Sequence, residues 1–245
     1  MDNYLPIFAH LPSGLRDGRS VHDGYQRGWG LEFSDLRQKI AADSDYVAAF
    51  QLAQNRSVVA SDRLMNLFLL VKFYLPRLSF GHIIEYGSYR GGSAFFLAAL
   101  AGKFLPGAMV YALDTFSGIA AADSGLDAHR AGDFSTTDFE ELSRAKTELG
   151  LGNLEFVRGL FSDTAPGVLA EAKSVALAHI DCDTYEAVKY AYIVSKPKMV
   201  HAGYFVFDDS TSSSCIGATQ AVEECVIRDD GRFSEQIFPH HVFRS

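Results

Sequence analysis

The sequence contains few cysteines and no long apolar run. Three cysteines among 245 residues are too few and too widely spaced for a disulfide framework or a zinc ribbon, which favours a reducing compartment. The longest apolar stretch, residues 64–75, is interrupted by Asn66 and Lys72 and is too short to span a bilayer. The N-terminus lacks the basic segment and apolar core of a signal peptide. We therefore expect a cytoplasmic protein with no membrane contact.

Basic residues are outnumbered by acidic ones. There are 22 lysines and arginines against 30 aspartates and glutamates, and the net charge of −8 argues against a nucleic-acid partner. Internal repeats and low-complexity tracts are absent, and 48% hydrophobic with 21% charged residues is typical of a globular chain. These totals favour one domain with a small accessory element, and a neutral substrate or a cation as its partner.

The usual nucleotide-binding motifs are also missing. The segment 82–101 is typical of a strand, a glycine turn and a helix, but it matches neither G-x-G-x-x-G nor a phosphate loop. Gly87 suits the tight turn after the strand, and Tyr89 with the bulky Arg90 follows where a dinucleotide fold needs a second glycine. A cofactor without phosphates, such as S-adenosylmethionine, fits this turn better. Asp114, 27 residues after Gly87, can accept hydrogen bonds from ribose hydroxyls, although a turn followed by a solvated aspartate is the simpler alternative.

The remaining chain alternates strand-like and helical runs. Residues 1–55 are polar and lack a sustained period, so we predict an N-terminal arm or lid with short helices at 35–42 and 45–54. From residue 83 onward, five apolar strands alternate with helices, and a further strand or two lies at 233–245. This order predicts an α/β protein, doubly wound, with a mostly parallel sheet and helices on both faces, over residues 56–245.

Acidic residues follow four of the predicted strands. Ligands of doubly wound folds bind beyond the carboxyl ends of the strands, so these acids are expected at one site. Oxygen-rich clusters of this kind suit Mg²⁺ or Ca²⁺. The alternative is that Asp183 and Asp209 cap the following helices, and we expect some acids to cap while others bind metal. The acids are Glu85, Asp114, Asp181, Asp183, Asp208 and Asp209.

Five segments together carry a resemblance to a known family. They are EYGSYRGGSAFFL, ALDTFSGI, LEFVRGLFSDTAP, LAHIDCDTYEAV and AGYFVFDDSTSSSCIGATQAVEE, between residues 83 and 224. The chain resembles the macrocin/mycinamicin O-methyltransferases, which use S-adenosylmethionine and Mg²⁺ to methylate sugar hydroxyls of macrolides and related natural products. The resemblance implies the Rossmann-like fold of class I methyltransferases and a glycosylated small-molecule acceptor.

The resemblance also implies roles for individual residues. Asp181, Asp208 and Asp209 are the expected metal ligands, and either His129 or Asp181 is expected to accept the proton of the attacking hydroxyl. The expected cofactor contacts are Glu85, Gly87, Ser88, Tyr89, Arg90, Ser93, Asp114, Thr115, Phe161, Ser162, Asp163 and Asp181.

Other interpretations remain open from the residues alone. A catechol-type O-methyltransferase would use Mg²⁺ at comparable strand ends, usually with an asparagine near the metal. An NAD-dependent dehydrogenase would share the fold but lacks its second glycine here, and a non-catalytic cofactor-binding protein would need no base. Tyr25 and Trp29 of the arm either line an acceptor pocket or contact a neighbouring subunit, so a homo-oligomer is expected. His240 and His241 should point to opposite faces of a strand rather than form a metal pair.

Overall fold

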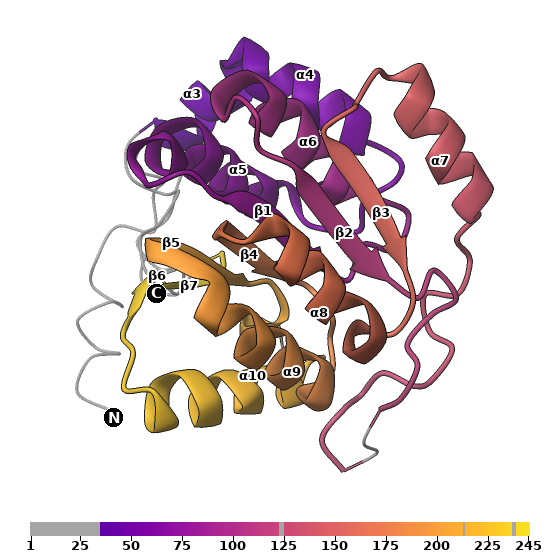
Figure 1. The fold of residues 1–245 in the computed structure, drawn as a ribbon, viewed down its shortest axis with the longest axis vertical. Helices are drawn as coiled ribbons and strands as arrows, with labels where there is room; N and C mark the ends of the chain where they lie inside the picture. The colour runs from indigo at the N-terminus through magenta and orange to yellow at the C-terminus, as the bar shows by residue number, and fades with distance from the viewer. Residues whose placement is uncertain (1–34, 123–124, 213, 237–238) are drawn as a thin grey trace, which may run out of the picture.

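A seven-stranded sheet forms the middle layer of the protein (Figure 1). The computed structural model describes residues 35–122, 125–212, 214–236 and 239–245. Five strands are parallel, and the last two are antiparallel additions at one edge, so the predicted mostly parallel sheet is confirmed. In sheet order the strands are β3 (Leu154–Arg158), β2 (Val110–Asp114), β1 (His82–Tyr86), β4 (Val175–Ile180), β5 (Met199–Phe207), β7 (His241–Arg244) and β6 (Ser234–Gln236).

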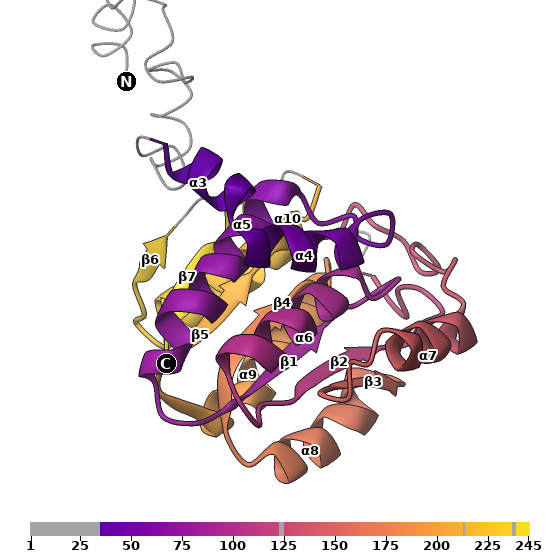
Figure 2. The same cartoon turned by 90° about the horizontal axis from the view of Figure 1, so that it is seen from above.

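Helices cover both faces of the sheet because side chains alternate along each strand. Ile83 of β1 packs in the core beneath α4, α5 and α6, whereas its neighbour Ile84 packs in a second core with α8 and α9. Figure 2 shows α8 on the opposite side of the sheet from α4 and α5. The helices are α3 (Leu36–Ala42), α4 (Ser44–Ala53), α5 (Ser61–Leu69), α6 (Gly92–Phe104), α7 (Phe139–Glu148), α8 (Phe161–Ala172), α9 (Tyr185–Ser195) and α10 (Ile216–Ala221).

The two short helices predicted before residue 55 are present as α3 and α4. Tyr46 of α4 packs edge-on against Phe68 and Phe96, with ring centroids 5.5 and 5.9 Å apart. Lys72 holds the start of α4 through its ion pair with Asp43 at 2.6 Å. These helices therefore share the core of the sheet domain. Residues 1–34, with Tyr25 and Trp29, lie outside the described residues, and the predicted lid, homo-oligomer and cytoplasmic location stay predictions.

The helical segment that begins with α5 changes its winding before it ends. After α5 the chain makes a π-helical turn over Leu70–Tyr74 and a 3₁₀ turn over Leu75–Arg77, which contains Pro76. A second π-helical segment, Val222–Asp229, follows α10. Among the described residues, no helix is long and apolar enough to cross a membrane.

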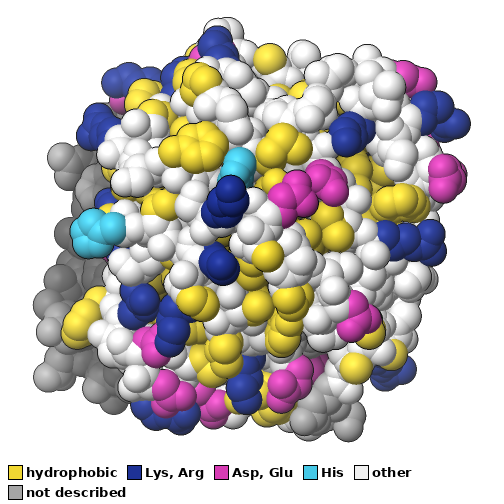
Figure 3. Space-filling view, viewed as in Figure 1, with side chains coloured by type: hydrophobic (Ala, Val, Ile, Leu, Met, Phe, Trp, Pro, Cys, Tyr) yellow, Lys and Arg dark blue, Asp and Glu magenta, His cyan; other side chains and the backbone are white. Residues whose placement is uncertain are grey.

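Charges of both signs are mixed on the face seen in Figure 3. Lysine and arginine side chains alternate with aspartate and glutamate there and do not gather into a basic patch on this side.

The strand order reverses between β1 and β4, and this reversal marks the expected position of a ligand site. β1 leads into α6 on one face and β4 leads into α9 on the other. Ligands of doubly wound sheets bind beyond the carboxyl ends of the strands at such a reversal. Acids lie at or just after the ends of four strands, and these strands, β2, β1, β4 and β5, are consecutive neighbours in the sheet. The acids predicted from separate parts of the sequence therefore share one edge.

Candidate active site

The turn after β1 closes against the segment that follows β4. Gly87 has φ +86°, and a Cβ atom there would lie 1.7 Å from the Asp181 carbonyl oxygen, so a larger residue cannot fit. Asp114 at the end of β2 accepts hydrogen bonds from the backbone N–H groups of Ser88 and Tyr89, both at 2.8 Å. Asp114 therefore fixes the shape of the turn in addition to facing the cavity beside it.

A cavity of about 430 Å³ opens at this edge of the sheet. Its volume is within the range of small-molecule sites, about 300–1,000 Å³. Most of the residues predicted for the cofactor and the metal line it. They are Gly87, Ser88, Tyr89, Ser93, Asp114, Thr115, Phe161, Ser162, Asp181, Asp208 and Asp209.

Four predicted site residues lie outside the lining of this cavity. Glu85 is fully buried and lies 3.0 Å from His179 Nδ1. Arg90 donates to the Thr136 hydroxyl at 2.9 Å. Asp163 accepts from the Ser162 hydroxyl in the first turn of α8. The fourth, His129, lies in the loop between β2 and α7, and its Nε2 is 3.5 Å from Asp183 Oδ1. Their assigned roles stay predictions.

The three predicted metal ligands come together. Asp181, Asp208 and Asp209 each present a carboxylate oxygen, and these oxygens lie within 4.8 Å of one another. Burial and then the charge of Asp208 raise the pKa of Asp209 to about 6, and the same two causes raise the pKa of Asp181. Asp183 is affected similarly, since burial and the Asp209 charge raise its pKa to about 8. Crowded carboxylates of this kind are relieved by a cation.

Asp208 differs from its neighbours because cationic and hydrogen-bonding groups surround it. Burial alone would raise its pKa, but hydrogen bonds with His179 and His240 and the charge of Arg63 hold the pKa below its ordinary value. His240 Nε2 lies 2.7 Å from Asp208 Oδ1, and Arg63 forms an ion pair with the other carboxylate oxygen. The Asn66 side-chain N–H₂ lies 3.1 Å from His240 Nδ1, which fixes Nε2 of the neutral ring as the donor to Asp208.

His179 lies between two acids beneath the cavity. Its Nδ1 is 3.0 Å from Glu85 and its Nε2 is 3.6 Å from Asp208. Burial lowers its pKa, but the hydrogen bonds and charges of Asp208 and Glu85 prevail and raise the pKa to about 9. His240 lies just before β7 and His241 is the first residue of that strand, so the two are not on one strand as predicted. His241 Nδ1 lies 2.8 Å from the Ser210 hydroxyl.

The capping interpretation of Asp183 and Asp209 is wrong. Neither side chain caps the helical segment that follows it. Asp209 instead accepts a hydrogen bond from the Asp183 N–H at 2.8 Å. The first N–H of α9, on Tyr185, is bound by Asp127 from the loop after β2. The Asp183 backbone and the Asp209 carboxylate are thus linked, and both residues line the cavity.

Several functional residues were missed by sequence reasoning. Arg63 and Asn66 lie three residues apart on α5, a spacing that puts both on one face and could have been noticed. The segment 56–59, Phe134 and Tyr190 also line the cavity, and nothing in their local pattern indicates this. The lining segment is attached to α7 by Arg56, which forms a bidentate ion pair with Glu141.

A family model for the macrocin-O-methyltransferases (TylF) matches residues 37–228 of the chain. The chain belongs to this family. It is 27% identical over 169 residues to the 8-demethyl-8-(2,3-dimethoxy-alpha-L-rhamnosyl)-tetracenomycin-C 4'-O-methyltransferase of Streptomyces olivaceus, across 65% of this chain and 64% of that protein. It is 26% identical over 182 residues to the demethyldecarbamoylnovobiocin O-methyltransferase of Streptomyces niveus, across 70% of this chain and 68% of that protein.

Two solved structures share the fold of this family member. The O-methyltransferase NovP superimposes with a TM-score of 0.66 at 23% identity, covering 77% of this chain and 81% of NovP. CalS11, a calicheamicin methyltransferase, gives a TM-score of 0.64 at 18% identity, covering 82% of this chain and 93% of CalS11. The predicted Rossmann-like fold of class I methyltransferases is thereby confirmed, and family membership favours a methyltransferase over a dehydrogenase.

Proposed function

We propose that the protein transfers a methyl group from S-adenosylmethionine to a sugar hydroxyl of a glycosylated natural product, with Mg²⁺ at the acceptor. The observation that supports this most is that the glycine turn after β1 and the cluster of Asp181, Asp208 and Asp209 face one cavity. The relatives named above act on a rhamnosyl tetracenomycin and on a novobiocin precursor, which supports a glycoside of antibiotic biosynthesis as the acceptor class.

The glycine turn fits the amino-acid end of the cofactor. The Ser88 hydroxyl is buried in the cavity lining and has no hydrogen-bond partner among the described residues. A buried polar atom normally has a partner, so a ligand group is the expected one. When bound, S-adenosylmethionine supplies an electrophilic methyl group on a cationic sulfonium. The carboxylates of Asp114 and Asp181 give the cavity a negative potential that favours this cation.

The acid cluster fits Mg²⁺. Its donor atoms are all carboxylate oxygens, and a hard cation of this kind would relieve the repulsion that raises the pKa of Asp181 and Asp209. When bound there, Mg²⁺ lowers the pKa of a hydroxyl that coordinates it. Asp208, held ionised by Arg63 and His240, would keep one negative ligand in place at any pH above the ordinary aspartate range.

His129 is the proposed general base. Its Nδ1 lies 3.5 Å from Asp133 Oδ2, so an Nδ1–H directed at this carboxylate leaves Nε2 free to accept a proton. Nε2 lies near Asp183 at the border of the cavity, where an acceptor hydroxyl beside the acid cluster would be. Asp181 then serves as a metal ligand, and its role in proton removal is indirect.

A ligand-binding experiment tests the proposal without knowledge of the acceptor. S-adenosylhomocysteine at 100 times its Kd should stabilise the protein by about 2.7 kcal/mol. At this chain length the melting temperature should rise by roughly 5–10 °C. NAD⁺ under the same conditions should give no shift. A shift with NAD⁺ and none with S-adenosylhomocysteine would contradict the methyltransferase assignment for this cavity.

A further inference from the structure

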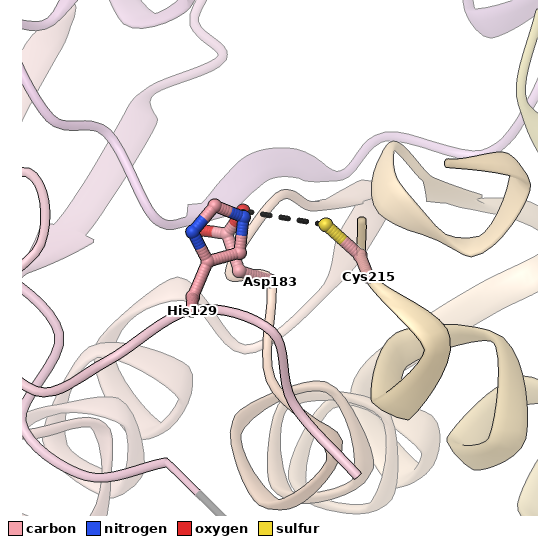
Figure 4. A group of neighbouring side chains, drawn as sticks. All are labelled: His129, Asp183 and Cys215. Carbon is pink, nitrogen blue, oxygen red and sulfur yellow. Dashed lines mark hydrogen bonds and ion pairs between the residues drawn. The ribbon is translucent and has the colours of Figure 1, made fainter. Parts of the chain in front are cut away.

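Three side chains of different metal-binding chemistry meet beside the acid cluster (Figure 4). His129 comes from the loop after β2, Asp183 from the segment after β4, and Cys215 directly precedes α10. Figure 4 shows the imidazole and the thiol both pointing toward the Asp183 carboxylate. One nitrogen, one oxygen and one sulfur atom of the three lie within 4.8 Å of one another.

The distances match those of a tetrahedral zinc site. His129 Nε2 lies 3.5 Å from Asp183 Oδ1, and Cys215 Sγ lies 3.7 Å from the same oxygen. Zinc bonds of about 2.3 Å to sulfur and about 2.0–2.1 Å to nitrogen and oxygen place tetrahedral ligand atoms about 3.3–3.6 Å apart. The two distances to Asp183 Oδ1 are therefore within a few tenths of an ångström of those in a zinc site, and the ligand atoms of all three residues lie within 4.8 Å of one another.

His129 also has the supporting carboxylate that zinc-binding histidines use. A metal-bound histidine normally donates its second ring N–H to a carboxylate or carbonyl, which fixes the orientation of the ring. His129 Nδ1 lies 3.5 Å from Asp133 Oδ2, and that oxygen also accepts from the Arg130 N–H at 2.9 Å. Two backbone hydrogen bonds join this loop to Ile119, from Ile119 N to Asp133 O and from Gly132 N to Ile119 O, both 2.9 Å.

The donor set separates this cluster from the adjoining acids. Asp181, Asp208 and Asp209 offer only carboxylate oxygens, which suit Mg²⁺, whereas sulfur and imidazole donors select zinc and other thiophilic ions. We propose that His129, Asp183 and Cys215 form a second cation site, which takes Zn²⁺. The Cys215 thiol gives its proton to solvent when the zinc–sulfur bond forms.

The second site adjoins the first, because Cys215 Sγ also lies 3.7 Å from Asp209 Oδ1. Zinc bound by His129 Nε2 would occupy the nitrogen that is proposed above to accept the acceptor proton. Zinc therefore inhibits methyl transfer even when Mg²⁺ is saturating. This effect on turnover rests on the proposed function, whereas zinc binding itself does not.

Cobalt substitution tests the site in the reduced full-length chain with saturating Mg²⁺ present. Co²⁺ should give a thiolate charge-transfer absorption in the near ultraviolet, which one equivalent of Zn²⁺ removes and further Mg²⁺ does not. Cys215→Ala should abolish the absorption and weaken Zn²⁺ binding by at least about tenfold. Cys225→Ala is the matched control, because Cys225 is also buried but lies in the helical segment after α10, and it should leave both unchanged.

His129→Ala provides a second variant that does not depend on a core substitution, since its side chain is 23% exposed on a loop. It should also weaken Zn²⁺ binding by at least about tenfold. The proposal is overturned if the wild-type protein gives no cobalt–thiolate absorption, if Cys215→Ala retains it, or if Mg²⁺ displaces the zinc competitively. The last result would place zinc on the acid cluster alone.

Discussion

Ser88 offers a test in which stability and ligand binding change in opposite directions. Its hydroxyl lies at the turn between β1 and α6, lines the cavity, and has no hydrogen-bond partner among the described residues. Ser88→Ala removes this hydroxyl but keeps the backbone N–H that donates to Asp114. The substitution therefore removes the proposed cofactor contact without loosening the glycine turn.

The expected magnitudes follow from the cost of an unpaired buried group. A buried polar atom without a partner costs about 1–3 kcal/mol. The ligand-free Ser88→Ala protein should therefore be at least as stable as the wild type, with a melting temperature higher by about 2–4 °C for each kcal/mol recovered. Loss of one hydrogen bond to the ligand, worth about 0.5–1.5 kcal/mol, should weaken S-adenosylhomocysteine binding about two- to thirteenfold.

Thermal unfolding without ligand and calorimetric titration with S-adenosylhomocysteine measure the two effects separately. Ser143→Ala is a suitable control, because its hydroxyl donates to the Phe139 carbonyl within α7, away from the cavity, and ligand affinity should not change. A Ser88→Ala protein that is less stable and binds S-adenosylhomocysteine as tightly as the wild type would refute the reasoning. The hydroxyl would then serve the fold instead of the ligand.

Three further predictions concern the acids. Asp181→Ala should abolish methyl transfer while S-adenosylhomocysteine affinity, measured by calorimetry, stays nearly unchanged; equal loss of both would assign Asp181 to the fold. His240→Ala should destabilise the protein by about 1–3 kcal/mol in urea unfolding and weaken Mg²⁺ binding, because the buried Asp208 and Asn66 each lose a hydrogen-bond partner. An unchanged unfolding curve would contradict this. With a chelator present, the free energy of unfolding should fall as pH rises from about 4 to 8. The reason is that the folded-state pKa values of Asp209 and Asp183, about 6 and about 8, exceed those of the unfolded chain. The folded state therefore holds more protons than the unfolded state in that window. The pKa of His179 is also raised, to about 9, so its titration lowers the free energy of unfolding further from about pH 6.5 upward. Saturating Mg²⁺ should flatten this slope in thermal scans, and an equally steep slope with Mg²⁺ would count against metal binding at these acids.

The sheet could be predicted because each central strand is a short apolar run with a clear end. β4 is buried at all six positions, and its sequence VALAHI is correspondingly apolar up to the acids that follow. Helix starts were harder to predict. α8 begins at Phe161, and the preceding residue, Leu160, makes no side-chain cap. Without a capping residue, the sequence holds no signal for that boundary.

The meeting of the three proposed metal ligands could be predicted from local pattern, whereas their supporting residues could not. Asp181, Asp208 and Asp209 follow strands, and strand ends on one edge must meet. Arg63 and Asp208 are 145 residues apart, and Asn66 and His240 are 174 apart, so only tertiary packing brings them together. The same limit applies to Cys215, whose thiol reaches Asp183 across 32 residues.

The surroundings of Asp208 explain why α5 and the C-terminal strand matter to the site. Asp208 and Asp209 are adjacent and buried, yet the pKa of Asp208 is lowered and that of Asp209 is raised. The difference arises because hydrogen bonds with His179 and His240 and the charge of Arg63 lower the pKa of Asp208, whereas burial and the Asp208 charge dominate at Asp209. One ligand is thereby kept negative while its neighbour can release a proton when a cation binds. Elements outside the glycine turn thus set the charge that the cluster offers to a metal.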